Sequence, residues 1–427
     1  MTSAPRHHHD VVVVGARAAG AATGLLLARM GHDVVIVDQT QLPSDTLSTH
    51  QIDRSGVVQL HRWGLLEAVL ASGAPAIRQV SFTLDGQTTT RDIKQKAGVD
   101  CLVAPRRYLL DAILAEAATR AGARLRLGVH VDGVRVDDTG RAVGVYGCDA
   151  TGVPIGIGAR FVVGADGLRS SVARSVGAEI IEHRGDAGAT QYAYYGGLAW
   201  SGIEFFTADR SLAGVFPTHH GQACIWVCTP SADAHAARRG AATRAEAYEA
   251  LLRRAAPTLA ARLRHARRTS LVTGMLRTPN QLRRAHGPGW ALVGDAGYHR
   301  DAIAGHGISD AYRDAELLAA ALDQALRGEL AETAALAGYA GQRDTALREI
   351  FELTCAMAAY PPVPTFTELH KRIGRAIETE ATALAARRLP GRPTPASTHP
   401  AATHPNPSRK APHRLRTRVA THEGEPL

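Results

Sequence analysis

The chain has 427 residues, of which 45 % are hydrophobic and 21 % are charged, as in globular proteins that bury a core. The net charge is +9, but residues 387–427 hold eight Lys/Arg and two acids, so the first 386 residues carry only +3. This distribution argues against a nucleic-acid-binding body. No apolar run reaches the ~18–20 residues that span a bilayer, and no signal-peptide layout opens the chain. Five scattered cysteines without a C-x-x-C pair fit a reducing, cytoplasmic location.

The N-terminal elements form a recognisable unit. Val11–Val14 is a β-branched run that predicts a buried parallel strand, and Ala21–Met30 predicts a helix. A second buried strand, Val34–Val37, ends at Asp38. Strand, glycine turn, helix and strand within ~30 residues are typical of a dinucleotide-binding unit.

The turn of this unit carries the first candidate binding residues. In the G-x-G-x-x-G pattern the glycines allow a tight turn, close approach of a pyrophosphate and packing of helix on strand. Here Arg17 replaces the middle glycine, and its guanidinium could contact a pyrophosphate bidentately. Asp38 stands 18 residues after Gly20, where an acid binds a ribose. The candidates are Gly15, Ala16, Arg17, Ala19, Gly20 and Asp38.

The elements beyond this unit follow in chain order. We expect helices over residues 55–71, 106–121, 231–266, 311–326, 333–357 and 366–389. We expect strands within residues 79–93, 124–163, 188–230, 269–278 and 290–293. From Pro390 the composition predicts a disordered basic tail.

Two further corners follow buried strands. Asp166-Gly167 comes after Phe161–Val163, and Gly294-Asp295 comes after Trp290–Val293. The second corner is followed by Gly305-His306-Gly307 and a helix. Each corner alone could be an ordinary turn with Asp as a helix cap, but three in this order are more specific.

With these corners, residues 9–340 resemble the FAD-dependent aromatic hydroxylases typified by p-hydroxybenzoate hydroxylase. The resemblance implies an α/β fold: a Rossmann-type, glutathione-reductase-like FAD-binding domain with an inserted mixed β-sheet substrate domain and C-terminal helices. It adds FAD contacts beyond the first turn, and it directs the N-terminus of the helix after Gly307 toward the flavin N1–C2=O edge. These further contacts are Arg106, Asp166, Gly167, Gly294, Asp295, Gly305, Gly307 and Ile308. The sequence departs from the family at Ala302, where a proline is usual, and at Ser309, where an asparagine is usual.

The implied domains are discontinuous in sequence. The FAD-binding domain is expected to comprise residues 1–75, 98–180 and 276–340, and the substrate domain residues 76–97 and 181–275. Residues 341–389 are the C-terminal helices, and residues 390–427 the tail.

The resemblance also implies an activity. NADPH or NADH would reduce FAD, and a flavin C4a-hydroperoxide formed with O2 would insert one oxygen atom into a small, aromatic or polyketide-like substrate. His50, His299 and His306 are candidates for catalytic proton handling, or else structural histidines. Arg300 and Asp301 either pair with each other or meet an acidic substrate. Candidates for a substrate pocket, with the core of a sheet as the alternative, are Tyr192, Tyr194, Phe216 and Trp226.

Other functions remain open on the sequence. An FAD-dependent reductase of the geranylgeranyl reductase-like type would use the same scaffold without oxygen uptake. A halogenase is disfavoured because the sequence has no W-x-W-x-I-P segment. No metal site, nucleic acid or membrane span is expected, and the protein would be a monomer or homodimer.

Overall fold

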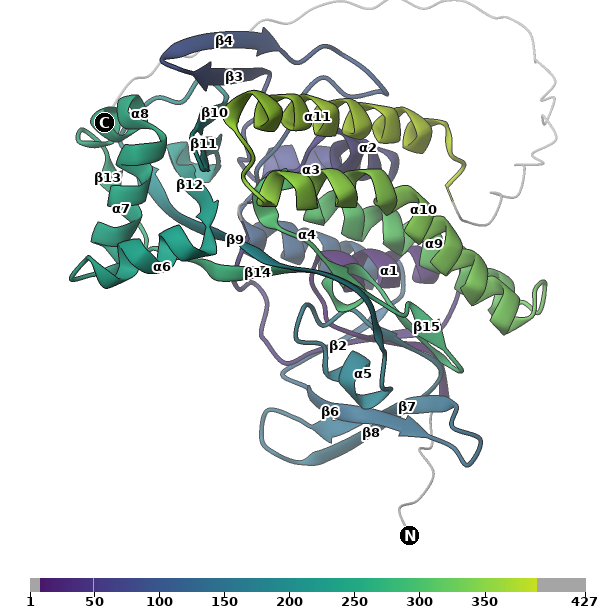
Figure 1. Cartoon of the computed structure of the whole chain (residues 1–427). Coiled ribbons are helices and arrows are strands. Elements are labelled where there is room, and N and C mark those ends of the chain that lie inside the picture. Colours follow the sequence, from purple (N-terminus) through teal and green to yellow (C-terminus); the bar gives the residue numbers. More distant parts are fainter. Residues whose placement is uncertain (1–7, 49, 390–427) are drawn as a thin grey trace, which may run out of the picture. The chain divides into compact units, whose positions relative to one another are not determined.

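The computed structural model describes residues 8–48 and 50–389, which belong to one compact unit (Figure 1). The predicted tail, residues 390–427, lies outside the described residues. Mixed helices and two sheets confirm the predicted α/β class. The assignment of residue ranges to separate domains stays a prediction.

The first sheet contains the predicted dinucleotide-binding strands. Its order is β15-β16-β8-β1-β2-β5, with β7 beside β8 and β6 beside β7. β1 pairs in parallel with β2 and with β8, and Val13 lies between Ile36 and Val163. Helices or neighbouring strands bury both faces, which is why these strands are continuous apolar runs. The strands are β1 (His8–Val14), β2 (Val34–Asp38), β5 (Arg124–Leu127), β6 (His130–Val136), β7 (Ala142–Cys148), β8 (Pro154–Gly164), β15 (His286–Gly287) and β16 (Trp290–Leu292).

The second sheet has the order β17-β14-β9-β12-β11-β10-β3-β4, with β13 beside β9. The hairpin β3–β4 lies within the predicted strand region 79–93 and turns at Asp85-Gly86, and it joins this sheet by parallel pairing of β3 with β10. The strands are β3 (Gln79–Leu84), β4 (Gln87–Asp92), β9 (Ile180–Gly196), β10 (Ile203–Ala208), β11 (Ser211–Pro217), β12 (Ala223–Pro230), β13 (Arg267–Arg268), β14 (Thr273–Arg283) and β17 (Tyr298–His299).

Helices cover both sheets. α1 packs against α4 and α9 on the first sheet, while α6 to α8 cover one face of the second sheet and α10 and α11 contribute apolar side chains to its other face (Figure 1). The helices are α1 (Ala18–Arg29), α2 (Arg54–Arg62), α3 (Leu66–Ala71), α4 (Arg107–Arg120), α5 (Ser171–Ser175), α6 (Ser231–Arg239), α7 (Arg244–Ala255), α8 (Pro257–Leu263), α9 (Gly307–Leu326), α10 (Glu332–Ala358) and α11 (Val363–Ala386). Short 3-10 turns are η1 (His219–Gly221), η2 (Gly294–Ala296) and η3 (Ala302–Ala304).

Two predicted helical ranges are divided in the structure. Residues 231–266 contain α6, α7 and α8. Residues 55–71 form two helices, α2 and α3, because Gly64 between them adopts a left-handed φ of 72°. Apolar residues at helical spacing continue across the break, since both helices bury a face in the same core. The periodicity therefore indicated the buried face but missed the turn.

The fold brings three chain turns to one edge of the first sheet. The carboxyl ends of β1, β8 and β16 are neighbours because these strands are adjacent and parallel. In open α/β sheets this edge is where ligands bind. Within the described residues, no helix is long and apolar enough to cross a membrane.

Candidate functional site

A cavity of about 690 Å³ lies at this edge. It is lined by the turn after β1, the end of β2, the turn after β8, and the segment from η2 to the start of α9. Its wall also includes residues of β9 and β14 from the second sheet. The cavity thus extends from the dinucleotide-binding turn to the second sheet.

The turn after β1 needs its glycines for space. Gly15 has a left-handed φ of 109°, and a Cβ there would lie 2.3 Å from the carbonyl oxygen of Ala165. A Cβ on Gly20 would lie 1.8 Å from the carbonyl oxygen of Gly15. Asp38 accepts a hydrogen bond from the Ala16 amide at 2.8 Å, which fixes the end of β2 beside the turn. These residues form a small-residue cradle at the N-terminus of α1.

Two helix N-termini face the cavity without a side-chain cap. No side chain caps α1 or α9, and their first residues line the cavity. The uncapped N–H groups and the helix dipole favour a negatively charged ligand. The first of these ends suits a pyrophosphate, since it follows the glycine cradle.

Arg17 reaches into the network beside the turn. Its Nη1 donates to Asp111 at 3.0 Å and to the Ser44 carbonyl oxygen at 3.1 Å. Asp111 also accepts from Arg107 at 3.0 Å, so one buried carboxylate holds two guanidinium groups. The predicted contact of Arg17 with a pyrophosphate stays a prediction, and the side chain does line the cavity.

The predicted contact of Arg106 with FAD stays a prediction. Its guanidinium stands 3.7 Å from the centre of the Tyr194 ring and pairs with Asp45. It does not line the cavity, whereas its neighbour Arg107 does. Sequence reasoning missed Arg107, because both arginines stand at the start of α4 and only the tertiary packing distinguishes them.

The second corner is fixed by a helix cap. Asp166 Oδ2 accepts from the Ser171 amide at 2.7 Å and from its hydroxyl at 2.8 Å. Its other oxygen, Oδ1, is buried and has no hydrogen-bond partner among the described residues. Gly167 adopts a φ of 77°. Both residues line the cavity, and the unsatisfied oxygen is a ready acceptor for a ligand hydroxyl.

The third corner closes the cavity. Gly294 has a φ of 61°, and a Cβ there would lie 2.8 Å from the Cβ of Ala19. Asp295 is half exposed, and His299 Nδ1–H donates to the Pro279 carbonyl oxygen at 2.8 Å. Gly305, with a φ of 63°, ends η3 before α9. Predicted site residues that line the cavity are Gly15, Arg17, Ala19, Asp38, His50, Asp166, Gly167, Tyr192, Gly294, Asp295, His299, Gly305, His306, Gly307 and Ile308.

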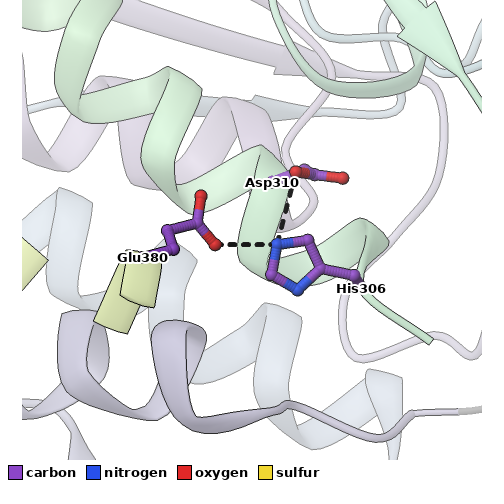
Figure 2. A group of neighbouring side chains, drawn as sticks. All are labelled: His306, Asp310 and Glu380. Carbon is purple, nitrogen blue, oxygen red and sulfur yellow. Dashed lines mark ion pairs between the residues drawn. The ribbon is translucent and has the colours of Figure 1, made fainter. Parts of the chain in front are cut away.

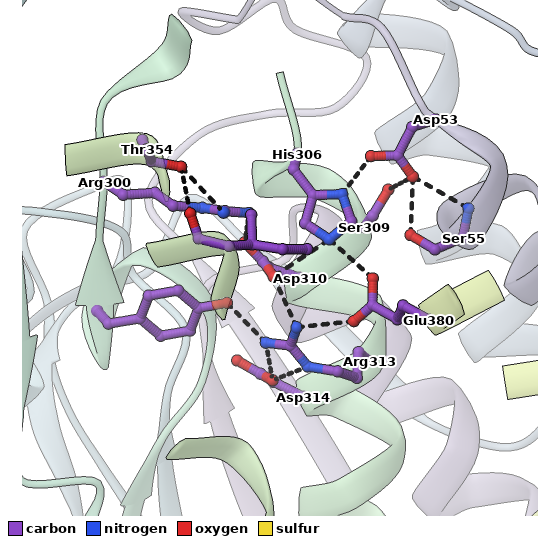
Figure 3. A network of polar contacts seen from close by, with 12 residues as sticks. Asp53, Ser55, Arg300, His306, Ser309, Asp310, Arg313, Asp314, Thr354 and Glu380 are labelled. Carbon is purple, nitrogen blue, oxygen red and sulfur yellow. Dashed lines mark hydrogen bonds and ion pairs between the residues drawn. The ribbon is translucent and has the colours of Figure 1, made fainter. Parts of the chain in front are cut away.

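His306 sits in a buried charged network (Figure 3). Its Nδ1–H donates to Asp53, and its Nε2 lies 2.8 Å from a carboxylate oxygen of Glu380. Burial alone would lower its pKa, but the carboxylates of Asp53, Asp310 and Glu380 raise it to about 10. His306 is therefore a cation at neutral pH, which makes it a poor proton-transfer group.

Arg300 belongs to the same network. It pairs with Asp310, so the predicted alternative of a pair with Asp301 is wrong. Asp301 instead accepts from the Ile303 amide at 2.9 Å and caps η3. Burial raises the pKa of Asp301 to about 6. It lines the cavity, and the sequence had not singled it out as a proton-handling group.

His50 is the opposite of His306. It is buried, and neither ring nitrogen has a hydrogen-bond partner among the described residues. Its ring stacks on Tyr194 at 5.5 Å between centroids, and its backbone φ is 70°. Burial, aided by the positive charges of Arg107 and Arg106, lowers its pKa well below 6.5. A neutral imidazole with two unsatisfied nitrogens can hydrogen-bond a bound molecule.

The predicted aromatic candidates separate into two groups. Tyr192 lines the cavity, accepts from the Ser48 amide at 3.2 Å, and has its pKa raised to about 12 by burial. Tyr194, Phe216 and Trp226 do not line it and pack in an apolar cluster with residues of α10 and α11. The alternative of a sheet core therefore describes these three better.

Other residues line this end of the cavity. Thr190, Met275 and Thr278 come from β9 and β14, and Thr278 Oγ1 is buried without a partner among the described residues. Thr190 could have been found from the sequence, because it shares a strand face with Tyr192 two positions away. Thr278 carries no such signal, since it lies beside a register shift in β14.

The cavity suits FAD on these observations. Gly15 and Gly20, where a Cβ would clash with a backbone oxygen, stand beside the uncapped N-terminus of α1, and Asp38, the predicted ribose contact, bonds the same turn. From this end the cavity continues past the second and third corners to β9 and β14.

The curated relatives differ in how much of this chain they match. Menaquinone reductase from Mycobacterium tuberculosis is 32 % identical over 170 residues, which are 39 % of this chain and 40 % of that protein. The matched region thus spans about two fifths of that relative's length. Digeranylgeranylglycerophospholipid reductase from Methanothrix thermoacetophila is 30 % identical over 315 residues, or 71 % of this chain and 74 % of that protein.

Solved structures share the fold at lower identity. A probable FAD-dependent monooxygenase, PqsL of Pseudomonas aeruginosa, has a TM-score of 0.71 at 24 % identity and covers 86 % of this chain and 100 % of that one. A triple mutant of the flavin-dependent brominase Bmp2 has a TM-score of 0.76 at 19 % identity and covers 88 % and 95 %.

The family comparison covers most of the chain. A family described as an FAD binding domain matches residues 8–354, which include all three glycine corners. The cradle at Gly15, the acid at Asp38 and the cavity that joins them agree with this match. The chain therefore belongs to the FAD-binding-domain family and is an FAD-dependent oxidoreductase.

Proposed function

We propose that the protein is an NAD(P)H-driven, FAD-dependent monooxygenase that transfers one oxygen atom from O2 to a small aromatic or polyketide-like substrate. The observation that carries the proposal is that one continuous cavity runs from the β1–α1 glycine turn to Tyr192 on the second sheet. Such a cavity has room for a dinucleotide at one end and a small substrate at the other. The resemblance to the aromatic hydroxylases supports the oxygen chemistry.

The residues of the chain would divide the work by position. When bound, FAD would accept two electrons and activate O2. Gly15, Gly20 and Asp38 would hold its ADP half, and Gly294 and Asp295 would hold the chain between its two halves. The N-terminus of α9 would stabilise negative charge at the far end.

The far end of the cavity would bind the substrate. Thr190, Tyr192 and Thr278 offer hydroxyl groups there, and Met275 offers an apolar surface. His50 stays neutral at physiological pH, so it would orient a substrate hydroxyl by a hydrogen bond without carrying charge. His299 and Asp301 border the same region, and either could exchange a proton with the reacting group.

The test follows the visible spectrum of FAD-loaded protein during anaerobic addition of NADPH or NADH, then of air with a panel of phenols. We expect bleaching by a nicotinamide, recovery of colour in air, and oxygen uptake with formation of a hydroxylated product. A protein that binds no FAD, or that is reduced but never oxygenates any phenol, would contradict the proposal.

A matched pair of glycine variants ties the result to the cradle. In Gly20→Ala the new Cβ meets the Gly15 carbonyl oxygen at 1.8 Å, so FAD affinity should fall at least about tenfold. In Gly338→Ala the Cβ meets nothing within 4 Å, so binding should stay unchanged. Fluorescence titration with FAD measures both.

A second candidate is an FAD-dependent reductase. It is favoured by the reductase relative that aligns with 71 % of the chain. Anaerobic reduction of a carbon–carbon double bond in an isoprenoid substrate, without oxygen uptake in air, would select it. The same anaerobic sample decides between the two activities.

A further inference from the structure

Three elements that are distant in sequence each place a carboxylate beside the imidazole of His306. Asp53 precedes α2, Asp310 lies in the first turn of α9, and Glu380 comes from α11 (Figure 3). They meet His306, whose side chain is fully buried. Asp310 and Glu380 lie 3.5 and 2.8 Å from Nε2. Figure 2 shows both carboxylates joined to this one ring nitrogen.

The charges around this imidazole require it to be protonated. Arg300 pairs with Asp310, and Arg313 pairs with Asp310 at 2.8 Å and with Glu380 at 2.9 Å. Arg313 is also shared with Asp314 at 2.8 Å. Two guanidinium groups therefore face four carboxylates, those of Asp53, Asp310, Asp314 and Glu380, and a buried carboxylate without a partner is strongly unfavourable. An imidazolium supplies a third positive charge to this cluster.

The same trio has the residue types of a metal site, but its surroundings do not suit a cation. His306, Asp310 and Glu380 come within 4.8 Å of one another. Arg300 and Arg313 already occupy the carboxylates, and both cations would repel a divalent ion. The cluster is a closed set of ion pairs.

The network stands directly behind the cofactor cavity. His306 is the N-cap residue of α9, and Gly305, His306 and Gly307 line the cavity. The glycine cradle at Gly15 would hold the ADP half of FAD. The flavin half would then lie in the rest of the cavity, which the turn formed by Gly305, His306 and Gly307 borders. The uncapped N-terminus of α9 adds its own partial positive charge at this wall.

We propose that His306 is held as a permanent imidazolium and, together with the N-terminus of α9, stabilises the negative charge of reduced FAD, so that it sets the reduction potential rather than transferring a proton. The inference rests on the proposed binding of FAD in this cavity. Two electrons and one proton, the content of a hydride, convert neutral oxidised flavin to a reduced form with one negative charge. The imidazolium cancels one negative charge of the buried carboxylates at this wall of the cavity, and this favours that form.

The C-terminal helix takes part in this arrangement. Glu380 lies beyond residue 354, where the family match ends, yet its carboxylate contacts both His306 and Arg313. Residues of α11 therefore act on the cofactor site through His306. Glu380 is a positioning residue, because it contacts the imidazole of His306 but does not itself line the cavity.

The test measures the midpoint potential of bound FAD by dye-coupled reduction in wild type and His306→Asn. Asn can still meet Asp53 but carries no charge, so reduction of FAD should become about tenfold less favourable, ~30 mV lower for a two-electron couple. The matched control is His32→Asn. His32 pairs with Asp323 at 2.7 Å outside the cavity, and its loss should leave the potential unchanged. An unchanged potential in His306→Asn would overturn the inference.

A second measurement uses wild-type protein alone, so it does not depend on whether a variant folds. In wild-type protein labelled with ¹⁵N-histidine, one imidazole should keep both ring protons at pH 9, where ordinary histidines are neutral. Absence of any such signal would overturn the inference. If the protein binds no FAD, the proposed function fails, while the NMR signal still decides the protonation state of His306. If FAD binds and its potential ignores His306, only the inference fails.

Discussion

Two buried histidines line the same cavity, and their pKa values are shifted in opposite directions. His306 contacts three carboxylates and has a pKa raised to about 10, whereas His50 contacts aromatic rings and has a pKa lowered well below 6.5. Both side chains are almost inaccessible to solvent. Burial disfavours the charged form in each case, so the difference comes from the partners alone.

The comparison assigns different uses to two residues of one type. A fixed cation in ion pairs with carboxylates suits a permanent electrostatic role, and a neutral ring whose two nitrogens have no hydrogen-bond partner among the described residues suits contact with a bound molecule. Substitutions that remove the partners, or the rings, should therefore have unequal consequences.

The largest effect is expected for Asp53→Asn. Asp53 bonds His306, accepts from the Ser309 hydroxyl at 2.8 Å and caps α2 through the Ser55 amide at 3.0 Å. Removing one charge of a buried network leaves its partner uncompensated, and the free energy of unfolding should fall by ~3–5 kcal/mol. Urea denaturation measures the loss. The control is Asp132→Asn, a substitution of an exposed side chain. If Asp53→Asn lowered the free energy of unfolding as little as this control does, the comparison would fail.

A pH dependence of intermediate size should follow from His306. Its pKa is raised from 6.5 to about 10 in the folded protein, so its contribution is complete below pH 6.5 and is lost as the pH rises through 10. The melting temperature of wild type should fall across this window. His306→Asn should show a shallower fall, and identical slopes in wild type and variant would contradict the assigned charge.

The smallest effect is expected for His50→Asn. The variant loses ring stacking worth about 1 kcal/mol, while Asn tolerates the positive φ of this position. His50 is neutral in the folded protein and gains a proton on unfolding below pH 6.5, so wild type loses stability as the pH falls. The variant should lose less between pH 6.5 and 4. His219 and His370 also have pKa values lowered to about 4. Both are present in wild type and variant, so part of the loss of stability at low pH remains in each protein.

Local sequence signals predicted the FAD end of the site. Gly15, Gly20 and Asp38 follow from strand, turn and helix patterns that are short in sequence, and the family match agrees with them. The roles of the individual residues stay predictions. Arg106 and Arg107 show the limit: both begin α4, but only packing decides which one reaches the cavity.

Long-range contacts decided the other end. Phe216 and Trp226 looked like pocket residues because aromatic side chains suit flat ligands, yet α10 and α11 contribute the apolar side chains that pack with them. Thr278 and Asp301 reach the cavity through a strand irregularity and a 3-10 turn that no local pattern announces.

What the sequence by itself determined is therefore the α/β class, the glycine corners and the order of most elements, because each depends on residues within a few tens of positions. The tertiary structure alone decided the charge of His306. Its three carboxylates come from positions 53, 310 and 380, and a pKa depends on which charges lie within a few ångströms, whatever their distance along the chain.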